Sequence, residues 1–221
     1  MTKKSKFFQL GNFAKISTLS AMFTGIVESV GKISRIDGNL FSIAHNFSEK
    51  FKIGDSIAIS GMCATVLESS LENFTVEIML ESRRRTVFGN SKMGDSVNLE
   101  RSAKIGDRNS GHFVTGHIDE VGKISKISRD GDAWKFRIGF SPENAALVVE
   151  KGSVAVDGTS MTVSAVSPKN SAECFFEICV ISHTFSHTLF GKKNIGDSVN
   201  LEFDILGKYI LRQNELREMK N

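Results

Sequence analysis

The sequence predicts an all-β protein with two tandem, homologous barrels and a C-terminal α-helix, and three observations support this fold class. Glycine is abundant, with 19 residues, and proline is rare, with 2, while Val, Ile, Ser and Thr are frequent. Such a composition is typical of short strands joined by glycine turns. The second half of the chain repeats the first, and the stretch after Asp204 is rich in helix formers.

The first 21 residues form an N-terminal extension outside this repeat. They carry Lys3, Lys4, Lys6 and Lys15 and no Asp or Glu. The remainder of the chain therefore contains 24 basic and 25 acidic residues. The extension fits an organellar transit peptide, a disordered tail, or a misassigned start codon ahead of Met22. Since the body is nearly neutral, we expect no nucleic-acid partner.

Cysteine usage and hydropathy predict a soluble, cytoplasmic protein. Cys63, Cys174 and Cys179 are odd in number and form no CxxC pair, which suits a reducing compartment. No apolar run approaches the roughly 20 residues that a membrane-spanning helix needs. We therefore expect no membrane association.

The internal repeat consists of three matched segments in the same order in both halves. The closest match pairs TVFGNSKMGDSVNLE with TLFGKKNIGDSVNLE. A period of this length indicates two domains rather than a solenoid. The pairs are residues 23–33 with 114–124, 54–66 with 151–163, and 86–100 with 188–202. We place the first barrel at residues 22–111 and the second at residues 112–204.

Within each copy, apolar residues recur with a period of two, which predicts strands. In the first copy one face is expected to hold Phe74, Val76, Ile78 and Leu80, and in the second copy Trp134, Phe136, Ile138 and Phe140. Short strands between glycine turns favour a small closed barrel.

One short helix is expected in each copy. In the second copy Ser141 can cap it, Pro142 occupies its first position, and Gly152 ends it.

Residues 205–221 form the C-terminal element, with Ile205, Tyr209, Arg212 and Leu216 at helical spacing. The first copy has no counterpart. A helix of this length is marginal in water on its own, so we expect it to pack against a partner.

Seven motifs inside the duplication resemble those of the riboflavin synthase family, and the resemblance runs from Met22 to about Tyr209. Ser60 and Ser182 depart from the family pattern, where Asn and Pro are usual. The motifs are MFTGIVE at 22–28, GxCxTV at 61–66, SVNLER at 96–101, SGHFVTGHID at 110–119, VDGTSMTV at 156–163, SHT at 182–184 and GDSVNLE at 196–202.

The resemblance implies two six-stranded Greek-key barrels, each binding one lumazine, and a C-terminal helix that holds a homotrimer together. Each active site would form between the N-terminal barrel of one subunit and the C-terminal barrel of its neighbour. Association with lumazine synthase is a further expected partnership.

The implied reaction is the last step of riboflavin biosynthesis, a four-carbon transfer between two 6,7-dimethyl-8-ribityllumazine molecules. It yields riboflavin and 5-amino-6-(D-ribitylamino)uracil, which makes the chain a transferase. Loss of a proton from the 7-methyl group begins the reaction, and the pteridine itself delocalises the charge, so we expect no cofactor and no metal. The protein must orient two rings, which can contribute roughly 7–11 kcal/mol.

Five residues are the catalytic candidates that the motifs supply. Ser160 and Thr162 lie two apart on a strand and so point the same way. The repeat aligns Cys63 with Ser160, and Cys63 is expected either to contact the ligand, to act as a covalent nucleophile, or to be a small buried hydrophobe. His117 replaces the aliphatic Ile26 of the first copy and suits proton transfer.

Asp204 is the fifth candidate, either as an acid near Ser160, as the resemblance implies, or as a helix N-cap. His112 is expected to be structural.

The substrate-binding candidates form two repeat-equivalent sets, and the resemblance adds Lys151, reaching a ligand of the adjoining subunit. Residues 77–82 and 181–186 are expected to be equivalent strands. The first set is Gly25, Ile26, Val27, Cys63, Ala64, Thr65, Glu77, Ile78, Met79, Leu80, Glu81 and Ser82. The second set is Gly116, His117, Ile118, Ser160, Met161, Thr162, Ile181, Ser182, His183, Thr184, Phe185 and Ser186.

Two other functions compete with the enzyme. A non-catalytic lumazine- or flavin-binding protein would share the fold and the pocket. A barrel that binds oligonucleotides would need a basic groove with exposed aromatic residues. The neutral body, with one Trp and one Tyr, argues against the second.

Overall fold

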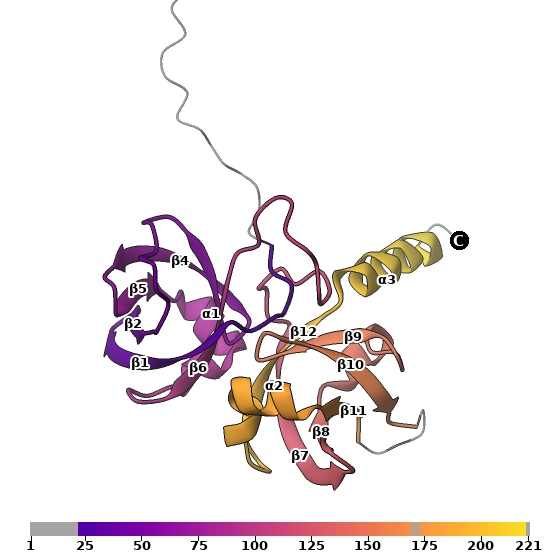
Figure 1. Cartoon of the computed structure of the whole chain (residues 1–221). Coiled ribbons are helices and arrows are strands. Elements are labelled where there is room, and N and C mark those ends of the chain that lie inside the picture. The colour runs from indigo at the N-terminus through magenta and orange to yellow at the C-terminus, as the bar shows by residue number, and fades with distance from the viewer. Residues whose placement is uncertain (1–21, 169–170, 172, 220–221) are drawn as a thin grey trace, which may run out of the picture.

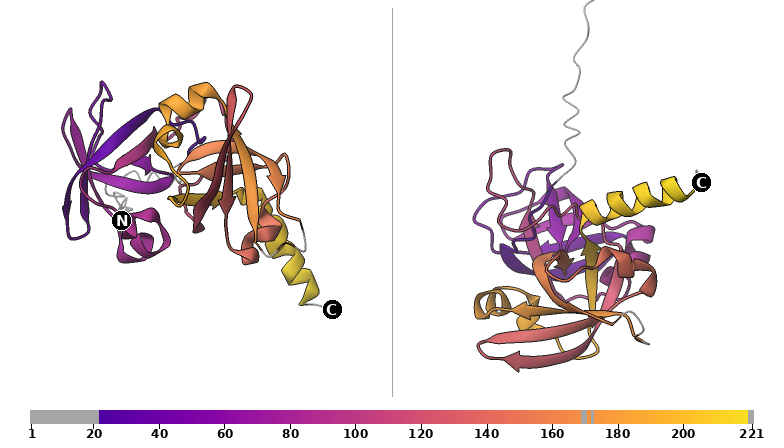
Figure 2. Two further views of the ribbon diagram at one scale, coloured as in Figure 1. Left: turned by 90° about the horizontal axis from the view of Figure 1, so that it is seen from below. Right: turned by 90° about the vertical axis from the view of Figure 1, so that its right-hand side faces the viewer.

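The computed structural model describes residues 22–168, 171 and 173–219, and it confirms the predicted fold class. Two closed antiparallel barrels lie next to each other, and one long helix projects away from them (Figures 1 and 2). The N-terminal extension expected over residues 1–21 lies outside the described residues.

The two barrels have the same strand connections. In each barrel the first two strands form a hairpin, and the third and fourth strands form a second hairpin. The second hairpin lies between the fifth and sixth strands, which gives a Greek-key order. The first barrel runs in the order β1 (Ser29–Asp37), β2 (Leu40–Ala44), β5 (Asn73–Glu77), β4 (Met62–Ser69), β3 (Ser56–Ile59) and β6 (Ser96–Arg101). The second runs in the order β7 (Glu120–Asp130), β8 (Ala133–Gly139), β11 (Phe175–Val180), β10 (Thr159–Val166), β9 (Ser153–Val156) and β12 (Ser198–Phe203).

Each barrel encloses its own apolar core, as the alternation predicts. Phe136 and Ile138 are fully buried in the second barrel, with Trp134 and Phe140 packed at its edge. In the first barrel Phe74, Val76 and Ile78 are buried, but Leu80 is 56% exposed. The prediction is wrong for Leu80 because the strand ends at Glu77 and a helix begins at Leu80.

Each copy contains one short α-helix, as predicted, but in the second copy it does not lie between Ser141 and Gly152. The fifth strand of each barrel leads into a short α-helix and then a 3₁₀ turn: α1 (Leu80–Arg85) with η1 (Val87–Gly89), and α2 (Ser182–His187) with η3 (Leu189–Lys192). Thr86 and Thr188 lie between the α-helix and the 3₁₀ turn of their barrels. Each hydroxyl donates a hydrogen bond to the carbonyl four residues earlier in the chain and accepts one from the N–H two residues later.

The helix expected between Ser141 and Gly152 is the 3₁₀ helix η2 (Pro142–Leu147) of the second barrel. Pro142 stands at its start as predicted, but the Ser141 side chain makes no capping hydrogen bond. The helix ends at Leu147, ahead of Gly152.

Residues 22–28 and 113–119, which we call the leading segments, precede β1 and β7 and join the two barrels. Phe23 and Val114 form an antiparallel bridge between the segments. Both side chains are fully buried and pack with Ala58 and Ala155 in a third apolar cluster between the barrels.

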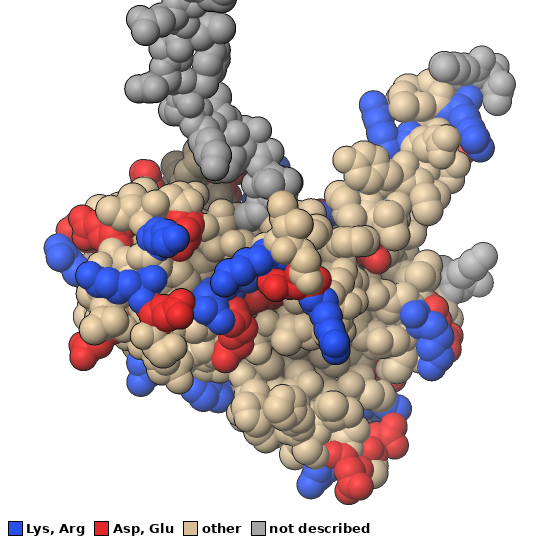
Figure 3. Space-filling view, turned by 45° about the horizontal axis from the view of Figure 1, so that its top comes forward, with Lys and Arg blue, Asp and Glu red and all other residues tan. Residues whose placement is uncertain are grey.

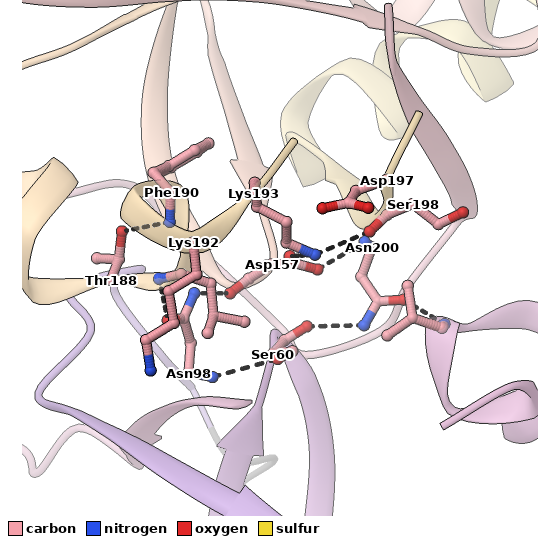
Figure 4. Close-up of polar contacts among 12 residues, drawn as sticks. Ser60, Asn98, Asp157, Thr188, Phe190, Lys192, Lys193, Asp197, Ser198 and Asn200 are labelled. Atoms are coloured by element: carbon pink, nitrogen blue, oxygen red, sulfur yellow. Dashed lines mark hydrogen bonds and ion pairs between the residues drawn. The ribbon is translucent and has the colours of Figure 1, made fainter. Parts of the chain in front are cut away.

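A reciprocal pair of buried amides, Asn98 on β6 and Asn200 on β12, also holds the barrels together (Figure 4). Asn98 donates to the carbonyl of Asp157 at 2.8 Å and accepts from the Leu189 N–H at 2.9 Å. Asn200 makes the equivalent contacts with Ser60 and Val87, at 2.9 and 2.8 Å. Each barrel thus satisfies buried backbone groups of the other.

Replacing Asn98 by Ala should lower the free energy of unfolding by about 2–4 kcal/mol. The substitution leaves the Asp157 carbonyl and the Leu189 N–H buried without partners, and each orphaned group costs about 1–3 kcal/mol. Urea denaturation measures the change, with the exposed Asn90 as the control for Asn→Ala. Equal stability of the two variants would show that the amide does not hold the barrels together.

The C-terminal segment forms α3 (Ile205–Glu218), as predicted, and none of its residues is buried. Of the helices in the described part of the chain, none is both long and apolar enough to cross a membrane. In the space-filling view, charges of both signs are interspersed over the barrels (Figure 3).

Candidate active site

Two equivalent strands, β4 and β10, carry the main catalytic candidates. Cys63 and Ser160 are half-buried, and Thr65 and Thr162 are exposed two residues further along. The residues between them, Ala64 and Met161, point into the barrel cores. Ala64 and Met161 can therefore offer a ligand mainly their backbone groups.

Each leading segment lies against the candidate strand of the other barrel. The Ser160 N–H of the second barrel donates to the Gly25 carbonyl at 2.8 Å, and the Cys63 N–H of the first barrel donates to the Gly116 carbonyl at 2.8 Å. Ile118 packs against the core of the first barrel. The two segments therefore cross over at the junction, so that each one contacts the candidate strand of the other barrel.

Glycine is required at both crossing points. Gly25 and Gly116 have φ values of +77° and +81°, which L-residues rarely adopt. A Cβ atom would lie 2.6 Å from the Ser160 Cβ at Gly25 and 2.5 Å from the Cys63 Cβ at Gly116. The close approach that glycine permits is thus to a neighbouring strand.

The residues that follow these glycines differ between the two segments. Ile26 and His117 occupy equivalent positions and are both exposed, while Val27 and Ile118 are half-buried. His117 follows Gly116, which contacts Cys63 of the first barrel. Ile26 follows Gly25, which contacts Ser160 of the second barrel. The structure therefore associates the exposed imidazole with the first barrel's strand.

His112, which we expected to be structural, contacts Ser160 directly. Its Nδ1 atom lies 2.7 Å from the Ser160 Oγ, and its ring is 8% exposed. Burial lowers the pKa of His112, and the charge of Asp204 opposes this shift. A neutral imidazole can accept the hydroxyl proton of Ser160, so this pair has the composition of an acid–base site.

Asp204 is the N-cap of α3, one of the two roles that the sequence left open, and its role as an acid near Ser160 stays a prediction. Its carboxylate accepts a hydrogen bond from the Leu206 N–H at 3.0 Å and so caps α3. The same negative charge acts on His112, which contacts Ser160.

The Cys63 side chain is a neutral thiol. Burial raises its pKa, with a smaller opposing effect from the hydrogen bond to Ser56. Because the thiolate is the reactive form of cysteine, this environment favours ligand contact over nucleophilic attack.

Of the segments expected as equivalent strands over residues 77–82 and 181–186, only Glu77 lies on a strand. Glu77 ends β5, Ile78 fills the first core, and Ile181 precedes α2. Met79, Leu80 and Glu81 are exposed at the start of α1 and Ser82 is half-buried within it. Ser182, His183, Thr184, Phe185 and Ser186 lie on α2. A helix presents these side chains in a different direction from a strand.

Aromatic rings fix α2 to the second barrel. Phe185 stacks on Trp134 with ring centroids 4.6 Å apart, and the Arg129 guanidinium lies 4.6 Å from the Trp134 ring centroid. His183 and His187 stack on each other at 4.2 Å. The Phe185 ring is thus engaged with the protein, whereas His183 remains exposed.

Lys151 is exposed and adopts a left-handed backbone, with φ of +65°. Its repeat counterpart is Gly54, with φ of +91°, and the two N–H groups make equivalent hydrogen bonds, to Val163 and Val66. The second copy therefore keeps a lysine where the backbone favours glycine.

Two buried carboxylates, Glu100 on β6 and Glu202 on β12, were not identified from the sequence as site residues. Their signal was the NLE tripeptide shared by both copies. Burial raises the pKa of Glu100 to about 7, against hydrogen bonds from Thr24 and Gly25 that lower it. Burial also raises the pKa of Glu202, against bonds from Thr115 and Gly116 and the charge of Lys208.

Glu100 should make stability depend on pH in the range between about 4.5 and 7. Its folded-state pKa is raised, so the folded state holds the proton more tightly and loses stability as the pH rises through this window. Relative to Glu100→Gln, the free energy of unfolding should fall by up to roughly 3 kcal/mol across the window. Urea titrations of both proteins at several pH values measure it; a constant difference would contradict the prediction.

Comparisons with known proteins agree with this architecture. The Lumazine binding domain matches residues 24–102 and 115–204. The riboflavin synthase of Actinobacillus pleuropneumoniae is 40% identical over 194 residues, covering 86% of this chain and 88% of its own. That of Schizosaccharomyces pombe is 40% identical over 200 residues, covering 85% and 91%, and that of Bacillus subtilis is 37% identical over 196 residues, covering 86% and 89%.

Solved structures show the same fold at lower identity. LumP complexed with riboflavin superposes with a TM-score of 0.71 at 22% identity, and covers 82% of this chain and 98% of its own. LumP complexed with 6,7-dimethyl-8-(1'-D-ribityl) lumazine superposes with a TM-score of 0.68. With two matched domains and relatives at this identity over most of their length, the chain belongs to the riboflavin synthase family.

Proposed function

We propose that the chain is a catalytically active riboflavin synthase, which converts two molecules of 6,7-dimethyl-8-ribityllumazine into riboflavin and 5-amino-6-(D-ribitylamino)uracil. The observation that carries the proposal is the presence of two equivalent sets of ligand-facing groups in one chain. A reaction between two copies of one substrate needs two such positions, and holding both rings supplies much of the rate.

Each ligand position combines a candidate strand, a short helix and the crossed leading segment. The first position uses Cys63 and Thr65 on β4, α1, and the segment that carries Gly116 and His117. The second uses Ser160 and Thr162 on β10, α2, and the segment that carries Gly25 and Ile26. The hydrogen bonds from the Cys63 and Ser160 N–H groups to the two glycine carbonyls support this grouping.

The two positions differ in their acid–base groups, which supports different roles for the two substrates. Ser160 has the buried His112 at 2.7 Å, and Asp204 adds a negative charge nearby. Cys63 has a neutral thiol, and the exposed His117 follows the glycine beside it. We assign removal of the 7-methyl proton to the second position, where Ser160 and His112 are in contact, with Thr162 and Asp204 in support, and we assign His117 to the orientation of the lumazine at the first position.

The active assembly is a cytoplasmic homotrimer in which the first barrel of one subunit faces the second barrel of the next. The exposed apolar side chains of α3 and the exposed Lys151 support an assembly in which both contact a neighbour. Residues 22–111 and 112–204 are then the two lumazine-binding units, and residues 205–221 the trimerisation helix. Association with lumazine synthase, which makes the substrate, stays a prediction.

Incubation of the purified chain with 6,7-dimethyl-8-ribityllumazine tests the proposal, with riboflavin fluorescence as the readout. The competing function is a lumazine- or flavin-binding protein without turnover. That protein would retain a fluorescent ligand through purification and form no riboflavin. Riboflavin formed at one molecule per two lumazines consumed is the expected result.

A further inference from the structure

We infer that Glu100 and Glu202 are positioning residues. Glu100 fixes the peptide before Gly25, and Glu202 fixes the peptide before Gly116. Through these two glycines, each leading segment contacts the candidate strand of the other barrel. Both carboxylates direct their hydrogen bonds into the leading segments. Their effect on turnover therefore passes through Gly25 and Gly116. The catalytic part of this inference rests on the proposed function.

Both carboxylates make the same set of hydrogen bonds. Glu100 accepts from the Thr24 N–H at 2.7 Å, from the Thr24 hydroxyl at 3.0 Å, and from the Gly25 N–H at 3.1 Å. Glu202 accepts from the Thr115 N–H at 2.6 Å, the Thr115 hydroxyl at 2.7 Å and the Gly116 N–H at 2.9 Å. Each carboxylate binds two consecutive backbone N–H groups, which fixes the plane of the peptide between them.

The same glycines carry the connection onward to the other barrel. Gly25 receives the Glu100 bond on its N–H and offers its carbonyl to the Ser160 N–H at 2.8 Å. Gly116 links Glu202 to the Cys63 N–H in the same way. Glu100 of the first barrel therefore positions the strand of Ser160, and Glu202 of the second barrel positions the strand of Cys63.

Burying a carboxylate lowers the stability of a fold, and this protein buries one at each of two equivalent positions, on β6 and on β12. Glu100 is 5% exposed and Glu202 is 1% exposed. Among the described residues, no Lys or Arg forms an ion pair with either one; Lys208, whose charge acts on Glu202, is paired with Asp119 at 2.7 Å. Burying a carboxylate without an ion-pair partner is unfavourable even when it accepts hydrogen bonds, so we infer that these groups do not serve stability alone.

The far end of each leading segment is held as well. The Glu28 carboxylate accepts a hydrogen bond from the Arg101 N–H, and the Asp119 carboxylate accepts one from the Phe203 N–H, both at 2.8 Å. The two donors, Arg101 and Phe203, directly follow Glu100 and Glu202 in the chain. With both ends held, the residue after each glycine can move little unless the carboxylate changes. Ile26 and His117 are those residues.

The test compares Glu100→Gln and Glu202→Gln in the full chain. An amide places an N–H₂ donor opposite the glycine N–H, which releases the peptide while keeping the side-chain shape. Glu68→Gln, an exposed carboxylate on β4, is the matched control. Hydrogen exchange followed by mass spectrometry should show protection falling at least 10-fold at residues 22–28 in Glu100→Gln only, and at residues 113–119 in Glu202→Gln only.

Kinetics then separate positioning from a merely structural role. A small displacement of a reacting group can cost about 10²-fold in rate, so kcat should fall about 10- to 100-fold with KM changed less than 3-fold. Glu→Asp at either site keeps an acceptor for the peptide and should recover part of kcat. Unchanged exchange in the leading segments, or unchanged kcat in variants with raised exchange, would overturn the inference.

The exchange measurement needs no ligand and so judges the clamp even if the proposed function fails. A wild-type chain that forms no riboflavin from lumazine would contradict the proposed function. Loss of protection confined to the matching segment would still support the clamp in that chain.

Discussion

Removal of residues 209–221 is expected to dissociate the homotrimer that we propose and to abolish turnover, while both barrels remain folded. The deletion removes most of α3, whose Tyr209 and Ile210 are 71% and 61% exposed in the single chain. Apolar surface of this kind marks an interface, and a 14-residue helix is marginal in water without one. The cut keeps Lys208 and its ion pair with Asp119, so the second leading segment is left intact.

Sedimentation measures the assembly, riboflavin fluorescence measures turnover, and circular dichroism with Trp134 emission reports the barrels. Arg212→Ala is the control, because Arg212 is exposed and its one ion pair among the described residues is with Glu215 on the same helix. Ile210→Lys should reproduce the deletion without shortening the chain. A truncated protein that remains trimeric and active would show that barrel contacts, rather than α3, build the catalytic site.

Gly116→Ala is expected to lower the free energy of unfolding by about 2–5 kcal/mol and turnover by about 10²-fold or more. The new methyl group would lie 2.5 Å from the Cys63 Cβ, whereas carbon atoms prefer about 3.5–4.0 Å. Overpacking costs roughly 1–3 kcal/mol and a left-handed L-residue roughly 1–2 kcal/mol. Relief of the overlap must separate the leading segment from the first barrel's ligand strand.

Gly54→Ala separates the two causes. Gly54 has a similar φ of +91°, but no atom lies within 4 Å of the position that its new methyl group would occupy, and its counterpart Lys151 shows that the fold accepts a side chain there. This control should lose about 1–2 kcal/mol, from backbone strain alone. Chemical denaturation and steady-state kinetics on both variants make the comparison; equal losses would mean that the crossing contact does not matter.

Local pattern predicted most of the fold. Strand alternation through Phe136 and Ile138, glycine turns and the duplicated motifs each depend on neighbours in sequence, so they could be interpreted from the sequence alone. The same logic failed at Leu80, where the chain turns from strand into α1, and contacts of α1 with residues distant in sequence are not visible in the local pattern. The Arg83 guanidinium, for example, donates to the Gly38 carbonyl of the β1–β2 turn.

The sequence by itself determined the two barrels and the appended helix, because a duplication preserves side chains that serve the same local role. Only the tertiary structure decided which groups meet. Ser160 meets His112, 48 positions away in sequence, and each leading segment crosses to the other barrel. Such pairings depend on how two nearly identical surfaces dock, and the repeat makes both own-barrel and crossed docking equally compatible with the sequence. The crossed arrangement consists of the hydrogen bonds that the Gly25 and Gly116 carbonyls accept from the Ser160 and Cys63 N–H groups, and glycine, which has no Cβ atom, permits this close approach.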